Sequence, residues 1–199
     1  MFSRVSRVVR RATVSNSRVT TEMSELSEQL KVRWESEGAS TRPGISQRKI
    51  SAFEARYGVH IPEDFRDYFC TVDGMEEGLS ENALISFWPL NKVEPVTRRV
   101  VEHSGVPDYS QIARKLKDAG SYFAFADFLI WSHVYAIRIG APHEKNEIVW
   151  ICGSHHSVIA DSFSAFIRAY LKDPNDVLCP APLRRGRISY ALHRMLGRV

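Results

Sequence analysis

Residues 50–74 read ISAFEARYGVHIPEDFRDYFCTVDG, and the fold of the chain can be worked out from this stretch. Apolar residues recur every three or four positions on both sides of a break between Gly58 and Pro62, which is the spacing of amphipathic helices. Gly58 is suited to end the first helix because glycine readily adopts the left-handed conformation found there. Pro62 is suited to begin the second helix, which we expect to end at Gly74. The stretch therefore predicts a helical hairpin.

The sequence on either side of the hairpin has other patterns. A helix is predicted before it, over Thr21–Ser36, and a closing helix is predicted from Asp161 or Ser162 to Leu171. Short aromatic and β-branched runs predict strands at Leu84–Trp88, Tyr122–Phe128, Ile130–Ile139, Glu147–Cys152 and Ser157–Ala160. Both faces of these strands are apolar, which is typical of strands that are covered on both sides or that pair in the centre of a sheet. We predict an α+β fold with an N-terminal helical hairpin, a central, mostly antiparallel sheet of about four to six strands, and a closing C-terminal helix.

Charge is distributed unevenly along the 199 residues, whose net charge is +4. Residues 1–21 and residues 180–199 each contain five Arg and no acidic residue. Of the 27 Lys and Arg, 17 therefore lie in residues 22–179 together with all 23 Asp and Glu, so that this part carries a charge of −6. We expect one α+β domain over residues 22–179, between a basic, disordered N-terminal segment and a basic C-terminal tail.

Cysteine usage and hydropathy bear on the compartment. The three Cys residues show no C-x-x-C spacing, which favours a reducing compartment over a disulfide framework. The most apolar stretch, Tyr122–Ile137, contains Asp127 and His133 and is shorter than the roughly 20 residues of a membrane-spanning helix. We expect a cytoplasmic protein. The first 20 residues also fit an organelle-targeting segment, or an extension upstream of a true start at Met23.

Five segments of the chain occur in an order that resembles a known family. They are residues 50–58, residues 61–74, ISFWPLNKVEPV at residues 85–96, YFAFADFLIWSHVYAIRI at residues 122–139 and VIADSFSAFIRAYL at residues 158–171. This order resembles the SUKH superfamily, named partly after yeast cell-wall assembly regulators, over residues 45–173. The two Arg-rich ends have no counterpart in the family pattern.

The resemblance implies a binding domain rather than an enzyme, because the family has no shared catalytic motif. The residues themselves predict neither a cofactor nor a bound metal. Bacterial members of the superfamily are regarded as immunity proteins that neutralise toxins, many of them nucleases or deaminases. Eukaryotic members resemble adaptors for regulatory partners. The function implied is therefore non-catalytic binding of a protein partner, of which a basic nuclease or deaminase toxin is one kind.

Five residues are candidates for contact with such a partner: Asp73, Glu76, Glu77, Glu81 and Trp88. The four acidic residues belong to one loop, which is either a solvated turn or a charged patch that attracts a basic partner. Trp88 precedes Pro89 at the end of a predicted strand, where we expect it to be partly exposed, and Trp is enriched at the centres of protein interfaces.

Two alternatives come from other parts of the sequence. The Arg-rich ends could bind nucleic acid or an anionic surface, with an affinity that falls steeply with salt. The run Cys152-Gly153-Ser154-His155-His156 is interpreted as a structural turn with surface histidines, and alternatively as a metal site or as a Cys152–His155 nucleophile pair.

Overall fold

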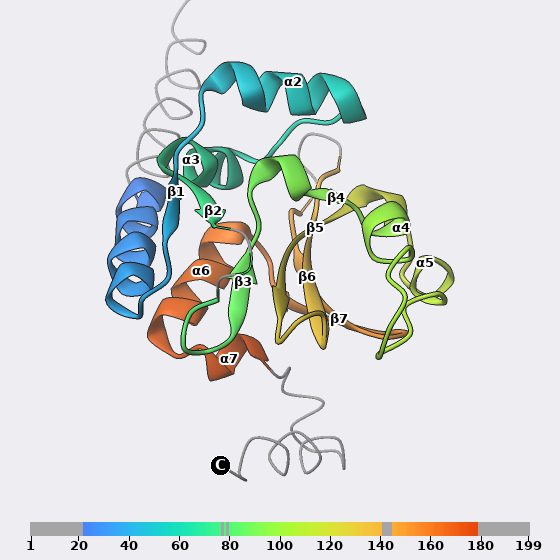
Figure 1. Ribbon diagram of the computed structural model, residues 1–199. Helices are drawn as coiled ribbons and strands as arrows, with labels where there is room; N and C mark the ends of the chain where they lie inside the picture. Colours follow the sequence, from blue (N-terminus) through green and yellow to red (C-terminus); the bar gives the residue numbers. More distant parts are fainter. Residues whose placement is uncertain (1–21, 77, 79, 141–144, 179–199) are drawn as a thin grey trace, which may run out of the picture.

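An antiparallel sheet lies between two layers of helices (Figure 1). The computed structural model describes residues 22–76, 78, 80–140 and 145–178. The sheet contains β3 (Ile85–Phe87), β4 (Glu94–Pro95), β5 (Tyr122–Phe128), β6 (His133–Arg138), β7 (Ile148–Cys152) and β8 (His155–Ala160). Its order is β3-β5-β6-β7-β8, with β4 also paired to β5. A separate antiparallel pair joins β1 (Thr41–Pro43) to β2 (Val72–Met75).

Helices cover both faces of the sheet, and so the predicted α+β fold is confirmed. The larger layer contains the helix at residues 22–36, α2 (Gln47–Tyr57), α3 (Glu63–Thr71), α6 (Phe163–Lys172) and α7 (Asn175–Leu178). The smaller layer contains α4 (Val96–Arg99) and α5 (Ile112–Lys115). Two 3-10 turns, η1 (Leu90–Lys92) and η2 (Ala119–Ser121), lie in the connections. None of the helices in the described part of the chain is long and apolar enough to cross a membrane.

A bulge in β5 decides which of its side chains reach each layer. Tyr122 and Ala124 face the smaller core, and Phe123 and Phe125 face the larger one. The register then shifts between Ala124 and Ala126, because one extra residue of β5 lies opposite β6. Beyond this bulge Asp127 pairs with Val134, and its carboxylate lies on the side of the smaller core.

The predicted helical hairpin is confirmed, but its end was placed wrongly. Helix α2 stops at Gly58, which has a φ of 66°, and α3 begins directly after Pro62. Helix α3 ends at Thr71 rather than at Gly74, because Val72 becomes extended and pairs with β1. Gly74 lies inside β2 with a φ of 72°. A Cβ atom there would lie 2.7 Å from the carbonyl oxygen of Phe87, so the glycine permits close contact between β2 and β3.

Candidate functional site

A groove of about 480 Å³ lies between the turn that joins β5 to β6 and the residues that flank β3. We call it the tryptophan groove, and it is lined by Glu76, Leu84, Trp88, Arg99, Asp127, Leu129, Ile130, Trp131 and their neighbours. The ring centroids of the two tryptophans are 5.0 Å apart. Ile130 is 87% exposed and Leu129 is 42% exposed, so the groove has an apolar rim that solvent can reach.

Unusual backbone conformations are concentrated around this groove. Leu84, Leu129, Ile130 and Trp131 all have positive φ angles, between 44° and 66°. A bulky or β-branched residue in this region is an outlier that costs on the order of 1–3 kcal/mol and is retained where the surrounding structure imposes it. Such residues cluster at binding and catalytic sites.

Asp127 and Tyr109 hold the strained turn in place. The carboxylate of Asp127 accepts hydrogen bonds from the indole Nε1 of Trp88, at 2.6 Å, and from the backbone N–H of Trp131, at 3.1 Å. The hydroxyl of Tyr109 donates to the carbonyl oxygen of Trp131 at 2.8 Å. Burial raises the pKa of Asp127, and the hydrogen bond from Trp88 opposes this shift. The turn is therefore fixed in shape before any ligand arrives.

Arg99 lies across both tryptophan rings. Its guanidinium carbon is 5.4 Å from the ring centroid of Trp88 and 5.2 Å from that of Trp131, which are distances of cation–π contact. The imidazole of His103 stacks on the indole of Trp131, with centroids 4.8 Å apart and an angle of 6° between the rings. The Nε atom of Arg99 is buried and has no hydrogen-bond partner in the part of the chain that the structure describes.

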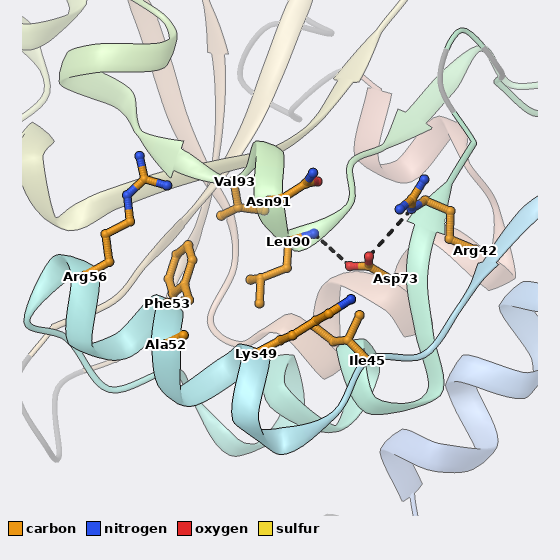
Figure 2. Close-up of a pocket in the computed structure, with 10 residues that line it drawn as sticks. All are labelled: Arg42, Ile45, Lys49, Ala52, Phe53, Arg56, Asp73, Leu90, Asn91 and Val93. Carbon is orange, nitrogen blue, oxygen red and sulfur yellow. Dashed lines mark hydrogen bonds and ion pairs between the residues drawn. The ribbon is translucent and has the colours of Figure 1, made fainter.

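A second hollow, of about 310 Å³, lies between α2 and the segment from η1 to β4 (Figure 2). We call it the basic cleft, because Arg42, Lys49 and Arg56 line it. Apolar side chains form its floor, notably those of Phe53, Leu90 and Val93.

Asp73 lies at one end of the basic cleft. Its Oδ1 accepts a hydrogen bond from the backbone N–H of Leu90 at 2.8 Å, and its Oδ2 lies 3.6 Å from the Nε of Arg42 (Figure 2). Burial raises the pKa of Asp73, and the Leu90 amide and the Arg42 charge oppose that rise.

The family comparison decides the assignment of the chain. The family model of the SMI1 / KNR4 family (SUKH-1) matches residues 44–169. The chain belongs to the SUKH-1 family. This match runs from just before α2 into α6, and it contains the whole tryptophan groove. No curated protein matches the chain.

Two interpretations of the acidic loop were left open, a solvated turn or a charged patch, and both require exposed side chains that Asp73 and Glu81 do not have. Asp73 is 6% exposed and Glu81 is 2% exposed. Asp73 is buried because it belongs to strand β2 and faces the basic cleft. Glu76 is exposed and lines the tryptophan groove, whereas Glu77 lies outside the described residues. Of the three carboxylates that the structure describes, two are buried, so these three do not form one exposed patch.

Trp88 is buried as well, contrary to the expectation that it is partly exposed. It is 7% exposed because Arg99 and Trp131 cover its ring and Asp127 holds its indole N–H. It forms a wall of the tryptophan groove rather than a projecting side chain.

Glu81 anchors the start of the segment that leads into β3. Its carboxylate accepts from the backbone N–H groups of Ala83 and Ile85, and it shares a hydrogen bond with the side chain of Glu37. Burial, together with the neighbouring Glu37, raises the pKa of Glu81 to about 7, and the hydrogen bonds from Ala83 and Ile85 oppose this shift.

The free energy of unfolding should therefore depend on pH through the titration of Glu81. Between pH 4.5 and about 7 the native state holds a proton that the unfolded chain has released, so stability is lost as the pH rises through this window. We expect Glu37→Gln to lower the pKa of Glu81 and to weaken this loss. A carboxyl-carbon NMR titration of Glu81 and urea unfolding at pH 5 and pH 8 measure the two effects.

The control for this measurement is Glu25→Gln, a change at an exposed glutamate on the helix at residues 22–36, which ends directly before Glu37. His133, whose pKa burial lowers to about 3, acts in the opposite direction below pH 6.5, and the comparison between variants cancels its contribution. An identical pH dependence in the Glu37→Gln and Glu25→Gln variants would contradict the assignment to Glu81.

The cysteine–histidine run of this SUKH-1 domain forms a hairpin turn, as predicted. Cys152 lies opposite His155 in the β7–β8 pair, and His155 and His156 are exposed. Burial raises the pKa of the Cys152 thiol, whereas a nucleophilic thiol needs a lowered pKa. Within the described ranges, no three His, Cys, Asp or Glu side chains are grouped so that they could hold a metal ion.

The turn of the tryptophan groove was missed in the sequence. A strand was predicted from Ile130, but β6 begins at His133. Leu129, Ile130 and Trp131 are not turn-forming residues, and no Gly, Asn or Pro marks the position. The basic cleft did carry a signal, because Lys49, Phe53 and Arg56 are spaced to lie on one face of a helix.

Proposed function

We propose that this SUKH-1 chain is a non-catalytic, cytoplasmic protein-binding domain that acts as an immunity protein or adaptor. Its partner is a protein such as a toxin, which it neutralises or regulates by binding. The observation that carries the proposal is the set of four strained residues, Leu84 and Leu129–Trp131, that line one groove. Membership of the SUKH-1 family supports the same class of function.

The chemistry of the tryptophan groove suits protein binding. Trp and Arg are the residues most enriched at the energetic centres of protein interfaces, and the groove combines two tryptophans with Arg99. Because Asp127 and Tyr109 already fix the turn, little conformational entropy is lost when a partner covers Ile130. The carboxylate of Asp127 is occupied by two donors, which favours a structural role for it over a role as general base.

A substitution of Ile130 should weaken binding of the partner without destabilising the fold. Since its side chain is 87% exposed, Ile130→Asp removes no core packing, and Asp tolerates a positive φ better than a β-branched residue does, so the free energy of unfolding should not fall. We expect the same substitution to weaken binding of the partner at least tenfold, because it places a charge at the apolar rim of the groove. A pull-down from the source lysate, followed by titration of the captured partner, measures the effect. If the partner is a toxin, inhibition of its activity should weaken in parallel.

The matched control is Val32→Asp, which places the same charge at a side chain that is 67% exposed on the helix at residues 22–36. Capture that survives Ile130→Asp unchanged would reject the groove as the contact. Capture that requires residues 1–21 or 180–199, and that disappears with nuclease or high salt, would instead favour nucleic-acid binding by the Arg-rich ends. Both ends lie outside the described residues.

A further inference from the structure

The basic cleft presents three cationic side chains from two elements. Lys49 and Arg56 lie on one face of α2, two turns or about 10 Å apart along its axis, and Arg42 comes from β1. Figure 2 shows the side chain of Phe53 between those of Lys49 and Arg56, and that of Leu90 across the cleft from α2. The cleft therefore alternates positive groups with apolar surface.

The positive groups outnumber the carboxylates near them. Arg42 lies 3.6 Å from Asp73, and Arg56 lies 3.8 Å from Glu94. Lys49 is exposed and has no carboxylate within 4 Å among the residues that the structure describes, although its charge helps to lower the pKa of Asp73. The Nε of Arg42 is buried without a hydrogen bond to any described residue. One positive charge of the cleft is thus left for a ligand.

The rest of the cleft favours a peptide over a nucleic acid. Single-stranded nucleic acids bind through aromatic faces on which bases stack, but Phe53 is 8% exposed and packs against Tyr57 and Phe123. A peptide carries a carboxylate and an apolar side chain on neighbouring residues, so that the first can reach Lys49 while the second contacts the apolar floor of the cleft.

We propose that the basic cleft binds an acidic segment of a protein, with a carboxylate of Asp or Glu at Lys49 and an adjacent apolar side chain on the floor at Phe53 and Leu90. This is a second binding site, on a surface other than the tryptophan groove and opposite in charge preference to the predicted acidic patch. It goes beyond the proposed function, because it assigns a ligand chemistry to residues that the groove does not use.

The experiment uses the full chain labelled with ¹⁵N and the acetylated, amidated peptide ELEVE as the probe, with QLQVQ as the neutral peptide. We expect ELEVE to shift the amide signals of Lys49, Phe53, Arg56 and Leu90, with a dissociation constant in the millimolar range, and to bind at least tenfold more tightly than QLQVQ. Lys49→Glu should weaken the binding of ELEVE at least tenfold. Arg48→Glu, the same change of charge at the neighbouring exposed residue outside the cleft, should weaken it less than twofold.

The proposal would be overturned if the two peptides bound equally or if neither bound. It would also be overturned if Lys49→Glu and Arg48→Glu weakened ELEVE binding equally. Tighter binding of oligo(dT) or inorganic phosphate than of ELEVE, detected at the same amides, would overturn it as well. Ile130→Asp should leave ELEVE binding unchanged, because Ile130 lies in the other hollow. If ELEVE does not bind, the proposal for the tryptophan groove is unaffected, because the capture experiment with Ile130→Asp tests it separately.

Discussion

Gly74→Ala is expected to lower the free energy of unfolding by about 3 kcal/mol or more, which is a large part of the stability of an ordinary domain. Two costs combine at this position. Alanine at a φ of 72° carries the penalty of the left-handed conformation, and its Cβ would lie 2.7 Å from backbone atoms of Phe87 and Trp88. Neither strand can move away freely, because β2 pairs with β1 and β3 pairs with β5. Urea unfolding of the two proteins measures the difference.

Gly58→Ala is the matched control for this prediction. Gly58 has nearly the same φ, 66°, but a Cβ there meets no atom within 4 Å. Its cost should be about 1 kcal/mol, which is that of the left-handed conformation alone. Equal losses at Gly58 and Gly74 would show that β2 and β3 are not in the close contact described.

Trp34→Ala is expected to cost about 3–5 kcal/mol, the usual range for removal of a large aromatic side chain from a core. Trp34 is fully buried, its ring centroid lies 4.8 Å from that of Phe87, and its Nε1 donates to the hydroxyl of Tyr170 at 3.0 Å. The substitution leaves a cavity and removes the hydrogen bond that Tyr170 receives. A lowered midpoint in a single cooperative urea transition is the expected result.

This prediction also tests the proposed domain boundary at residue 22. The family match begins at residue 44, whereas Trp34 belongs to a helix before that point. Val32→Ala, on the same helix but at a side chain that is 67% exposed, should change stability by less than about 0.5 kcal/mol. If the two variants unfold at the same urea concentration, the helix is not part of the domain core.

The two hollows give this SUKH-1 chain two surfaces of different chemistry. The tryptophan groove offers a rigid aromatic wall and an exposed isoleucine, and the basic cleft offers an unpaired lysine above an apolar floor. They are lined by different residues, so a partner could be contacted at one while the other remains available. Substitutions at Ile130 and at Lys49 can therefore be tested separately and in combination.

Local sequence determined the secondary structure and the class of fold. The apolar spacing of residues 50–74, the stop at Gly58 and the start at Pro62 all depend on residues within a few positions of one another. The strands were recognised for a similar reason, since continuous apolar runs are typical of strands buried on both faces. The order of these segments was enough to indicate the family that the comparison confirms.

Only the tertiary structure decided where the two hollows lie. The left-handed turn at Leu129–Trp131 is imposed by Asp127 and Tyr109, and Asp127 itself reaches that side because of the bulge in β5. Asp73 was assigned to an exposed loop because β1, which pairs with the strand that contains it, lies about 30 residues earlier in the chain. Contacts between residues far apart in the sequence leave no local pattern, and they can hold a side chain or a backbone in a conformation that its neighbours alone would disfavour.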